Sequence, residues 1–194
     1  MIPISPIEKY KQDLTRDDFQ YDAAQENAVK HLQRLYDDMM AKPLPVKGFK
    51  KVLNRWVKIY AKPEKATIKG LYFWGGVGRG KTYLMDCFFD SLPFAKKRRL
   101  HFHRFMQQIH RQLTVRAGQK DPLHAIADQL ANEIRVLCFD EFFVADIADA
   151  MILGTLFERL FKRGVVLVCT SNIPPDQLYL DGLQRQRFLP TISL

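Results

Sequence analysis

Hydrophobic positions along the chain follow two different periods. Short apolar runs occupy residues 70–74, 134–139 (interrupted by Arg135) and 165–169, and a shorter alternating run lies at 100–103. Such runs, bounded by turn residues, predict strands. Apolar residues recur at helical spacing at about 6–14, 23–40, 83–89, 104–116, 122–132 and 147–162. Because strands alternate with helices, the pattern predicts an α/β fold in which helices cover both faces of a parallel sheet.

Capping residues mark where several of these helices begin. Ser5 to Glu8 form a capping box with proline at the first helical position. Asp22 to Gln25 repeat this logic, with glutamine at the third position. Asp146 is the expected N-cap of the helix over 147–162, and Asp149 is its third residue. We interpret both acids as capping and dipole partners rather than as catalysts.

Two basic segments need separate interpretations. Residues 49–60 combine apolar residues at helical spacing with several basic ones and predict a basic amphipathic helix. This helix either packs on the rest of the protein or is attracted to an anionic membrane surface. The run from Lys96 to Arg99 predicts a solvated turn before the strand over 100–103. His101 and His103 share one face of that expected strand, and without a third ligand we interpret them as structural.

Length and charge narrow the class of protein. The 194 residues suffice for one sizeable domain, and we divide them into a helical segment and linker over 1–66 and a nucleotide-binding domain over 67–194. No run of about 18 apolar residues and no secretory signal is present, which predicts a cytoplasmic protein. The net charge of +9 suits a polyphosphate ligand and also permits an anionic partner. Three cysteines inside apolar runs predict buried, reduced thiols and no zinc site.

One segment follows the strand over 70–74 and matches G-x-x-x-x-G-K-[ST], the pattern of a phosphate-binding loop. It consists of Gly75, Gly76, Val77, Gly78, Arg79, Gly80, Lys81 and Thr82. Glycines let successive backbone N–H groups point inward, and the helix that follows adds the positive end of its dipole. Lys81 supplies a charge for the β- and γ-phosphates of a nucleotide, and Thr82 supplies a hydroxyl ligand for Mg²⁺. The segment therefore predicts nucleotide binding.

Polar residues end two of the later strands. Asp140 and Glu141 follow one apolar run, and Asn172 follows the next. The carboxyl ends of parallel strands open onto the ligand crevice, so Asp140 can reach the Mg²⁺ held by Thr82. Glu141 can reach the water that attacks the γ-phosphate, which makes it the expected catalytic carboxylate. Asn172 either orients that water as a sensor of the γ-phosphate or serves the turn before Pro174.

Two further positions carry open alternatives. Gln25 is either a capping-box residue or a donor and acceptor for the edge of adenine. Arg185 and Arg187 either form a solvated basic turn or face the nucleotide of a neighbouring subunit. An arginine delivered in this way stabilises charge on the transferring phosphoryl group.

Five stretches together resemble the AAA+ ATPases and, more narrowly, the ZapE family of bacterial cell-division ATPases, which are related to mitochondrial AFG-type ATPases. The likeness covers nearly the whole chain. Its stretches are 71–82, 100–106, 138–151, 170–175 and 182–190.

The resemblance assigns roles to residues. It implies that Gly75 to Thr82 bind ATP, that Asp140 and Glu141 are the metal and water residues, and that Asn172 is the first sensor. Arg187, which Phe188 follows, fits the family's trans-acting arginine better than Arg185 does. Phe105 and Met106 fall where AAA+ proteins often carry a pore loop.

The resemblance also implies a cellular role. It implies Mg²⁺-dependent ATP hydrolysis coupled to remodelling of a protein assembly in cell division, with the division ring protein FtsZ as client. The full-length protein is expected to form a homo-oligomeric ring and to contact the cytoplasmic side of the inner membrane. One departure is that the sequence up to Leu194 holds neither the fifth strand nor the helical lid of an AAA+ module. We therefore expect apolar surface where that strand would pair.

An alternative function is that of a nucleic-acid-acting AAA+ ATPase, such as a helicase loader. The net charge of +9 favours it. Against it, no basic stretch outside residues 49–60 is interleaved with several aromatic residues suited to base stacking. A nucleotide switch without turnover is a further alternative, against which Glu141 argues.

Overall fold

A parallel sheet of four strands lies at the centre of the computed structural model, which describes residues 4–41 and 68–193. The strands are β1 (Leu71–Trp74), β2 (Lys97–His101), β3 (Val136–Asp140) and β4 (Val166–Ser171), in the spatial order β1-β4-β3-β2. All three strand pairs are parallel. The predicted α/β fold is confirmed.

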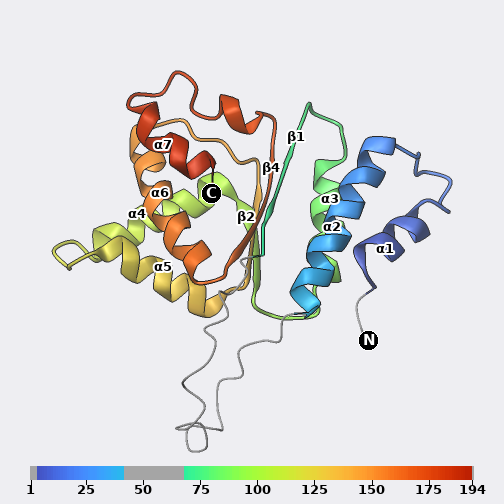
Figure 1. Cartoon of the computed structure of the whole chain (residues 1–194), viewed down its shortest axis with the longest axis horizontal. Coiled ribbons are helices and arrows are strands. Elements are labelled where there is room, and N and C mark those ends of the chain that lie inside the picture. Colours follow the sequence, from blue (N-terminus) through green and yellow to red (C-terminus); the bar gives the residue numbers. More distant parts are fainter. Residues whose placement is uncertain (1–3, 42–67, 194) are drawn as a thin grey trace, which may run out of the picture.

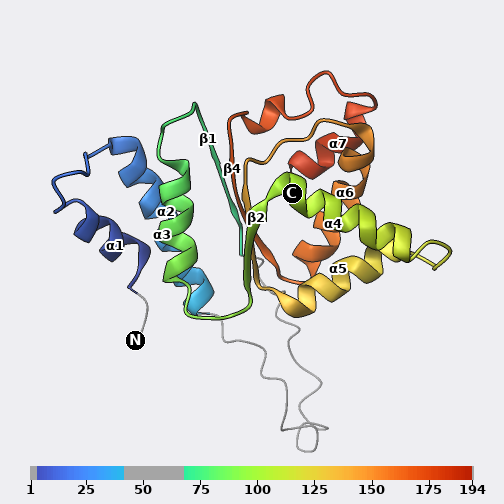
Figure 2. The same ribbon diagram turned by 180° about the vertical axis from the view of Figure 1, so that it is seen from behind.

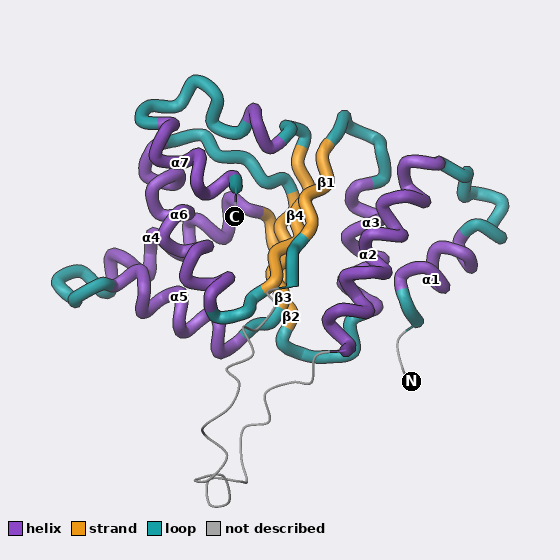
Figure 3. Tube along the Cα trace, viewed as in Figure 1, coloured by secondary structure: helices purple, strands orange, loops and turns teal. Residues whose placement is uncertain are grey.

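Helices form a layer on each face of the sheet (Figures 1 and 2). One layer holds α1 (Pro6–Asp13), α2 (Ala23–Ala41) and α3 (Lys81–Ser91). The other layer holds α4 (Phe102–Val115), α5 (Pro122–Glu133), α6 (Ile147–Lys162) and α7 (Arg185–Ile192), and a 3₁₀ turn, η1 (Pro175–Gln177), follows β4. Figure 3 shows the strands as a narrow band between the two layers.

The central strands are buried on both faces, and their residues alternate between two apolar cores. Val136 and Cys138 of β3 face α1, α2 and α3, whereas Leu137 and Phe139 face the layer of α4 to α7. Parallel strands that are covered on both faces have mostly apolar sequences, which is why apolar and polar residues do not alternate in the central strands. β1 lies at the edge of the sheet and is only partly buried, in contrast to the buried strand predicted for 70–74.

The N-terminal helices pack directly on α3. The Tyr83 hydroxyl donates a hydrogen bond to Asp13 at 2.8 Å, and the Cys87 thiol donates to the carbonyl oxygen of Pro6 at 3.3 Å. The predicted capping box at Ser5 is present. The boundary that we place between residues 66 and 67 and the amphipathic helix predicted over 49–60 lie outside the described residues.

The sequence prediction for residues 96–103 is wrong in two ways. Lys97 to Arg99 belong to β2 rather than to a solvated turn, and α4 begins at Phe102, so His101 and His103 do not share a strand face. Long basic side chains can bury their stems while their charged ends find partners. Lys97 does so by donating to the carbonyl oxygens at the C-terminal end of α3, at 2.6 and 2.9 Å.

Phe105 and Met106 are 1% and 2% exposed and pack in the core beneath α4, so they line no pore surface here.

The predicted N-cap at Asp146 is confirmed, since its carboxylate accepts from the backbone N–H of Asp149. All three cysteines are buried and unpaired, as predicted. Within the described residues, no helix combines the length and the apolar character that crossing a bilayer requires.

Candidate functional site

The loop between β1 and α3 has the backbone of an anion-binding nest. Gly78 and Gly80 adopt positive φ angles of 80° and 75°, and Gly80 is the N-cap of α3. Lys81 and Thr82 are the first two residues of that helix, so the orphan N–H groups of its first turn face the loop. Fixed N–H dipoles at a helix N-terminus favour a bound phosphate.

Lys81 points back over this loop. Its ammonium group donates to the carbonyl oxygens of Gly75 and Gly76, each at 2.7 Å. The charge is thereby held above the turn where phosphates would lie. Thr82, Val77 and Gly78 are exposed, and Trp74, directly before the loop, is 59% exposed.

Gln25 of α2 lies against the same loop, although α2 is far from it in sequence. The structure places its side-chain amide beside Gly80, where a Cβ atom would stand 2.5 Å from Nε2. The N-cap contacts come from Asp22 instead, whose carboxylate accepts from Ala24 at 2.7 Å. Gln25 Oε1 is buried and has no hydrogen-bond partner among the described residues. The capping-box role is therefore not what this side chain does, and an unpaired acceptor lies next to the phosphate loop.

Asp140 ends β3 on the face that α3 covers. Its carboxylate is 17% exposed and lies in the fork of Arg99 from β2. Arg99 Nε donates to Oδ2 at 2.8 Å and Nη2 donates to Oδ1 at 3.1 Å. Sequence reasoning missed Arg99 because it assigned the basic run to a turn. The two-residue spacing of Lys97, Arg99 and His101 is the signal of a strand face that could have revealed it.

Glu141 turns away from the sheet at the end of β3. Its φ angle is 55°, and its side chain is 80% exposed. The backbone N–H of Glu141 donates to Thr170 Oγ1 at 3.3 Å, and that of Phe142 donates to the Thr170 carbonyl at 2.7 Å. His101 Nδ1 lies 3.8 Å from its carboxylate. These contacts join the ends of β3 and β4, and the parallel pairing of the strands puts the exposed Glu141 at the same edge of the sheet as the end of β1.

The remaining predicted residues follow β4. Asn172 is exposed directly after the strand, so it lies at the same edge of the sheet as Asp140 and Glu141. Arg185 is partly buried and donates to the backbone carbonyl of Asp176. Arg187, two positions later in the first turn of α7, is exposed. Of the two arginines, Arg187 is the more exposed, whereas Arg185 is held by the Asp176 carbonyl.

The residues at this edge fit a magnesium–nucleotide complex. Within residues 4–41 and 68–193, no group of three or more His, Cys, Asp or Glu side chains could hold a metal ion by itself. Magnesium is usually held by one or two protein oxygens together with phosphate oxygens and waters. Thr82 and Asp140 match that sparse donor set, while the loop and Lys81 match the phosphates.

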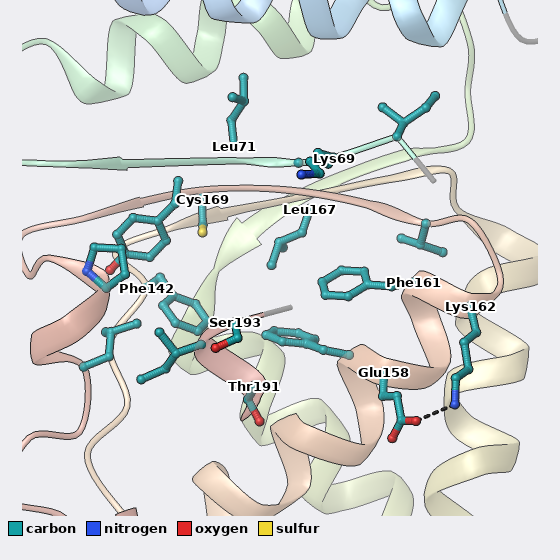
Figure 4. A pocket seen from close by; sticks show the side chains of 18 of the residues that line it. Lys69, Leu71, Phe142, Glu158, Phe161, Lys162, Leu167, Cys169, Thr191 and Ser193 are labelled. Atoms are coloured by element: carbon teal, nitrogen blue, oxygen red, sulfur yellow. Dashed lines mark hydrogen bonds and ion pairs between the residues drawn. The ribbon is translucent and has the colours of Figure 1, made fainter. Parts of the chain in front are cut away.

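A separate apolar pocket of about 600 Å³ lies beside the edge strand β1 (Figure 4). Phe142, Phe161 and Leu167 are among the side chains that line it, and Glu158 and Lys162 pair at its rim. The pocket lies between the sheet, where β1 and β4 line it, and the helices α6 and α7. Its lining holds none of the residues predicted to bind nucleotide.

Comparisons of the sequence identify its relatives. A family described as AFG1-like ATPase matches residues 4–194. The chain is 50% identical over 196 residues to the cell division protein ZapE of Escherichia coli K12, which covers all of this chain and 52% of the relative. It is also 47% identical over 137 residues to lactation elevated protein 1 homolog B of Danio rerio, covering 65% of this chain and 27% of that protein. The chain thus spans about half the length of ZapE.

Comparisons of the structure identify neighbours with the same fold. The crystal structure of DnaI matches with a TM-score of 0.59 at 18% identity, covering 91% of this chain and 81% of that one. AMPPCP-bound DnaA from Aquifex aeolicus matches with a TM-score of 0.57 at 14% identity, covering 89% and 46%. At such identities the likeness shows the fold alone, which agrees with the predicted α/β fold.

Proposed function

This chain belongs to the AFG1-like ATPase family, and on that premise we propose that it binds ATP with Mg²⁺ and hydrolyses it. One observation carries the proposal. The phosphate loop, with Lys81 at the N-terminus of α3, lies at the edge of the sheet where β3 ends with Asp140 and is followed by Glu141. A loop alone would support binding only, whereas the adjoining acids support hydrolysis.

Each residue has a distinct part in this proposal. Backbone N–H groups of the loop and the Lys81 ammonium hold the phosphates, and Thr82 and Asp140 hold the Mg²⁺, which neutralises phosphate charge. Glu141, exposed and directed outward, accepts a proton from the attacking water, and Asn172 orients that water. Proton transfer to a positioned carboxylate contributes about 10²–10⁴ in rate.

Gln25 supplies adenine recognition in this proposal. Its unpaired Oε1 beside Gly80 is the supporting observation, because a buried acceptor without a partner gains a hydrogen bond from the N6 amino group. Arg187 is proposed to act on the nucleotide of a neighbouring subunit in a ring formed by the full-length protein. Its exposure on α7 supports this role over Arg185, which is tied to Asp176.

The similarity to ZapE supports a place in cell division. We propose that hydrolysis in the full-length protein remodels a protein assembly in the cytoplasm, with FtsZ as the client, at the inner face of the membrane. Co-sedimentation of FtsZ polymers with the full-length protein, with and without ATP, tests the client directly. Association that does not depend on ATP would contradict the proposed coupling between the nucleotide and the client.

The ATPase proposal is tested by two substitutions measured in two assays. Lys81→Ala is expected to weaken ATP binding by about tenfold or more, because a charge-assisted contact contributes about 1.5–3 kcal/mol. Glu141→Gln is expected to retain binding and lower phosphate release by about 10²–10⁴. Glu133→Gln, at the exposed end of α5, is the matched control and should change neither. Unchanged phosphate release in Glu141→Gln of the full-length protein would reject the hydrolase assignment.

A further inference from the structure

Arg99 of β2 forms hydrogen bonds to both β3 and α3, the two elements that carry Asp140 and Thr82. It stands opposite Cys138 in the parallel register of β2 and β3. Asp140 lies two residues further along β3 and therefore on the same face of the sheet. The guanidinium grips both oxygens of Asp140, at 2.8 and 3.1 Å, and its third nitrogen, Nη1, donates to Asp86 of α3.

Asp86 makes this contact significant for the site. It lies four residues after Thr82 on α3, and residues at this spacing share one face of a helix. One guanidinium therefore joins the helix that carries Thr82 to the strand that carries Asp140. These are the two residues that we propose as magnesium ligands.

The carboxylates of Asp140 and Asp86 favour the charged form of Arg99. Arg99 is 20% exposed and Asp140 17% exposed, whereas Asp86 is half exposed. Partial burial opposes the charged form, but the hydrogen bonds and charges of Asp140 and Asp86 outweigh it, so the pKa of Arg99 lies above its usual value. The cluster carries one positive and two negative charges, which leaves a net negative charge beside the expected cation.

We propose that Arg99 is a positioning residue that fixes the Asp140 carboxylate, and with it the spacing of Asp140 from Thr82, for Mg²⁺. This inference rests on the proposed nucleotide function. A carboxylate has about four lone-pair sites, and the fork occupies only one on each oxygen. The remaining lone pairs stay available to the metal or to its waters, in a plane that Arg99 sets. Partners of this kind typically contribute 10- to 100-fold to metal affinity or activity.

Lysine cannot reproduce the arrangement although it carries the same charge. Its single ammonium is a point charge on a flexible stem, whereas the guanidinium presents donors in a planar fork. Arg99→Lys therefore separates positioning from simple charge neutralisation. If only charge mattered, lysine would restore the function of the site.

The experiment measures how much Mg²⁺ strengthens ATP binding, by titrating a fluorescent ATP analogue with and without the metal. We expect Arg99→Lys to reduce this Mg²⁺ enhancement about tenfold while affinity without metal stays within about twofold. Asp140→Asn should reduce it similarly, and the double variant should match Asp140→Asn alone, because Arg99 acts through Asp140. Arg98→Lys is the matched control, since Arg98 faces the other layer and donates to Gln108.

Several outcomes would overturn the inference. Full Mg²⁺ enhancement in Arg99→Lys, or additive losses in the double variant, would show that Arg99 does not act through Asp140. If Arg99→Lys fails to fold by circular dichroism, Asp86→Asn replaces it, because this half-exposed substitution removes the second anchor and should also lower the enhancement. If ATP binding depends on Lys81 but the Arg99 and Asp86 variants keep the full Mg²⁺ enhancement, only the role of Arg99 is rejected and the proposed function stands. Absence of Lys81-dependent binding rejects the proposed function and this inference with it.

Discussion

The side chain of Gln25 lies against Gly80, so closely that a Cβ atom on Gly80 would stand 2.5 Å from Gln25 Nε2. Helix α2 thereby touches the phosphate loop at the residue that begins α3. The N-terminal helices are thus part of the wall of the candidate site rather than a remote attachment. Glycine suits the φ angle of 75° at this point, and a side chain here would also have to displace the end of the Gln25 side chain.

Gly80→Ala is expected to destabilise the protein and weaken ATP binding, because the new methyl group must displace Gln25 and the backbone stays left-handed. Gly118→Ala is the matched control, since Gly118 has a φ angle of 83° but open space around its Cβ position. The control should be destabilised only by the cost of a left-handed backbone at alanine, about 1–2 kcal/mol. Urea unfolding and ATP titration of both variants measure the difference. Equal losses of stability and binding in the two variants would show that the contact with Gln25 is unimportant.

Gln25→Ala is expected to weaken ATP binding and to reduce the preference for ATP over GTP. A bidentate amide–adenine contact contributes about 1–3 kcal/mol of discrimination, so the loss should be at least about fivefold. Asn27→Ala, an exposed position on the same helix, should leave both quantities unchanged. Parallel titrations with ATP and GTP provide the measurement. An unchanged ATP-to-GTP ratio in Gln25→Ala would rule out adenine recognition by this residue.

The fold could be predicted largely because the strands β3 and β4 are buried on both faces. Such strands leave uninterrupted apolar runs, such as Val165 to Cys169, and the glycine and aspartate residues that flank them mark the helix ends. β2 could not be predicted in the same way. It lies at the edge of the sheet, and its positions on the face that α3 covers, Lys97 and Arg99, are basic residues that find carbonyl and carboxylate partners.

The candidate site could be predicted as a set of residues but not as a set of contacts. The motif places Lys81 and Thr82 at the start of a helix, and the strand ends place Asp140 at the same edge. The partner of Asp140 depends on the register between β2 and β3, which brings Arg99 diagonally beside it. Register is a property of the packed sheet, so the two-residue spacing around Arg99 can indicate a strand face but does not identify Asp140 as its partner.

Phe139→Ala is expected to destabilise the protein by about 3–5 kcal/mol, as for other buried phenylalanines. The ring is fully buried in β3, and its centroid lies 4.7 Å from that of Phe105 and 5.6 Å from that of Phe102. Phe143→Ala is the matched control, because this nearby ring is 54% exposed and its loss should change stability by about 0.5 kcal/mol or less. Urea denaturation midpoints provide the comparison. Similar midpoints for the two variants would contradict the assigned core.

Alkaline conditions are expected to destabilise the protein through its buried thiols. Burial raises the pKa of Cys138 to about 12 and that of Cys87 to about 11, whereas an unfolded thiol has a pKa of about 8.5. A raised folded-state pKa stabilises the protein fully below the unfolded value, and this contribution is lost as pH rises from about 8.5 towards 12. Each such group steepens the decline by up to about 1.4 kcal/mol per pH unit.

Cys138→Ala should therefore make the loss of stability between pH 8.5 and pH 11 less steep, whatever its effect at pH 7. Val168→Ala is the control, because Val168 is the buried register partner of Cys138 on β4 and carries no titrating group. It creates a cavity of its own but should retain the alkaline slope of the parent protein. Urea unfolding at several pH values gives the slopes. If Cys138→Ala and Val168→Ala decline equally steeply, the Cys138 thiol does not stay protonated in the folded protein through burial.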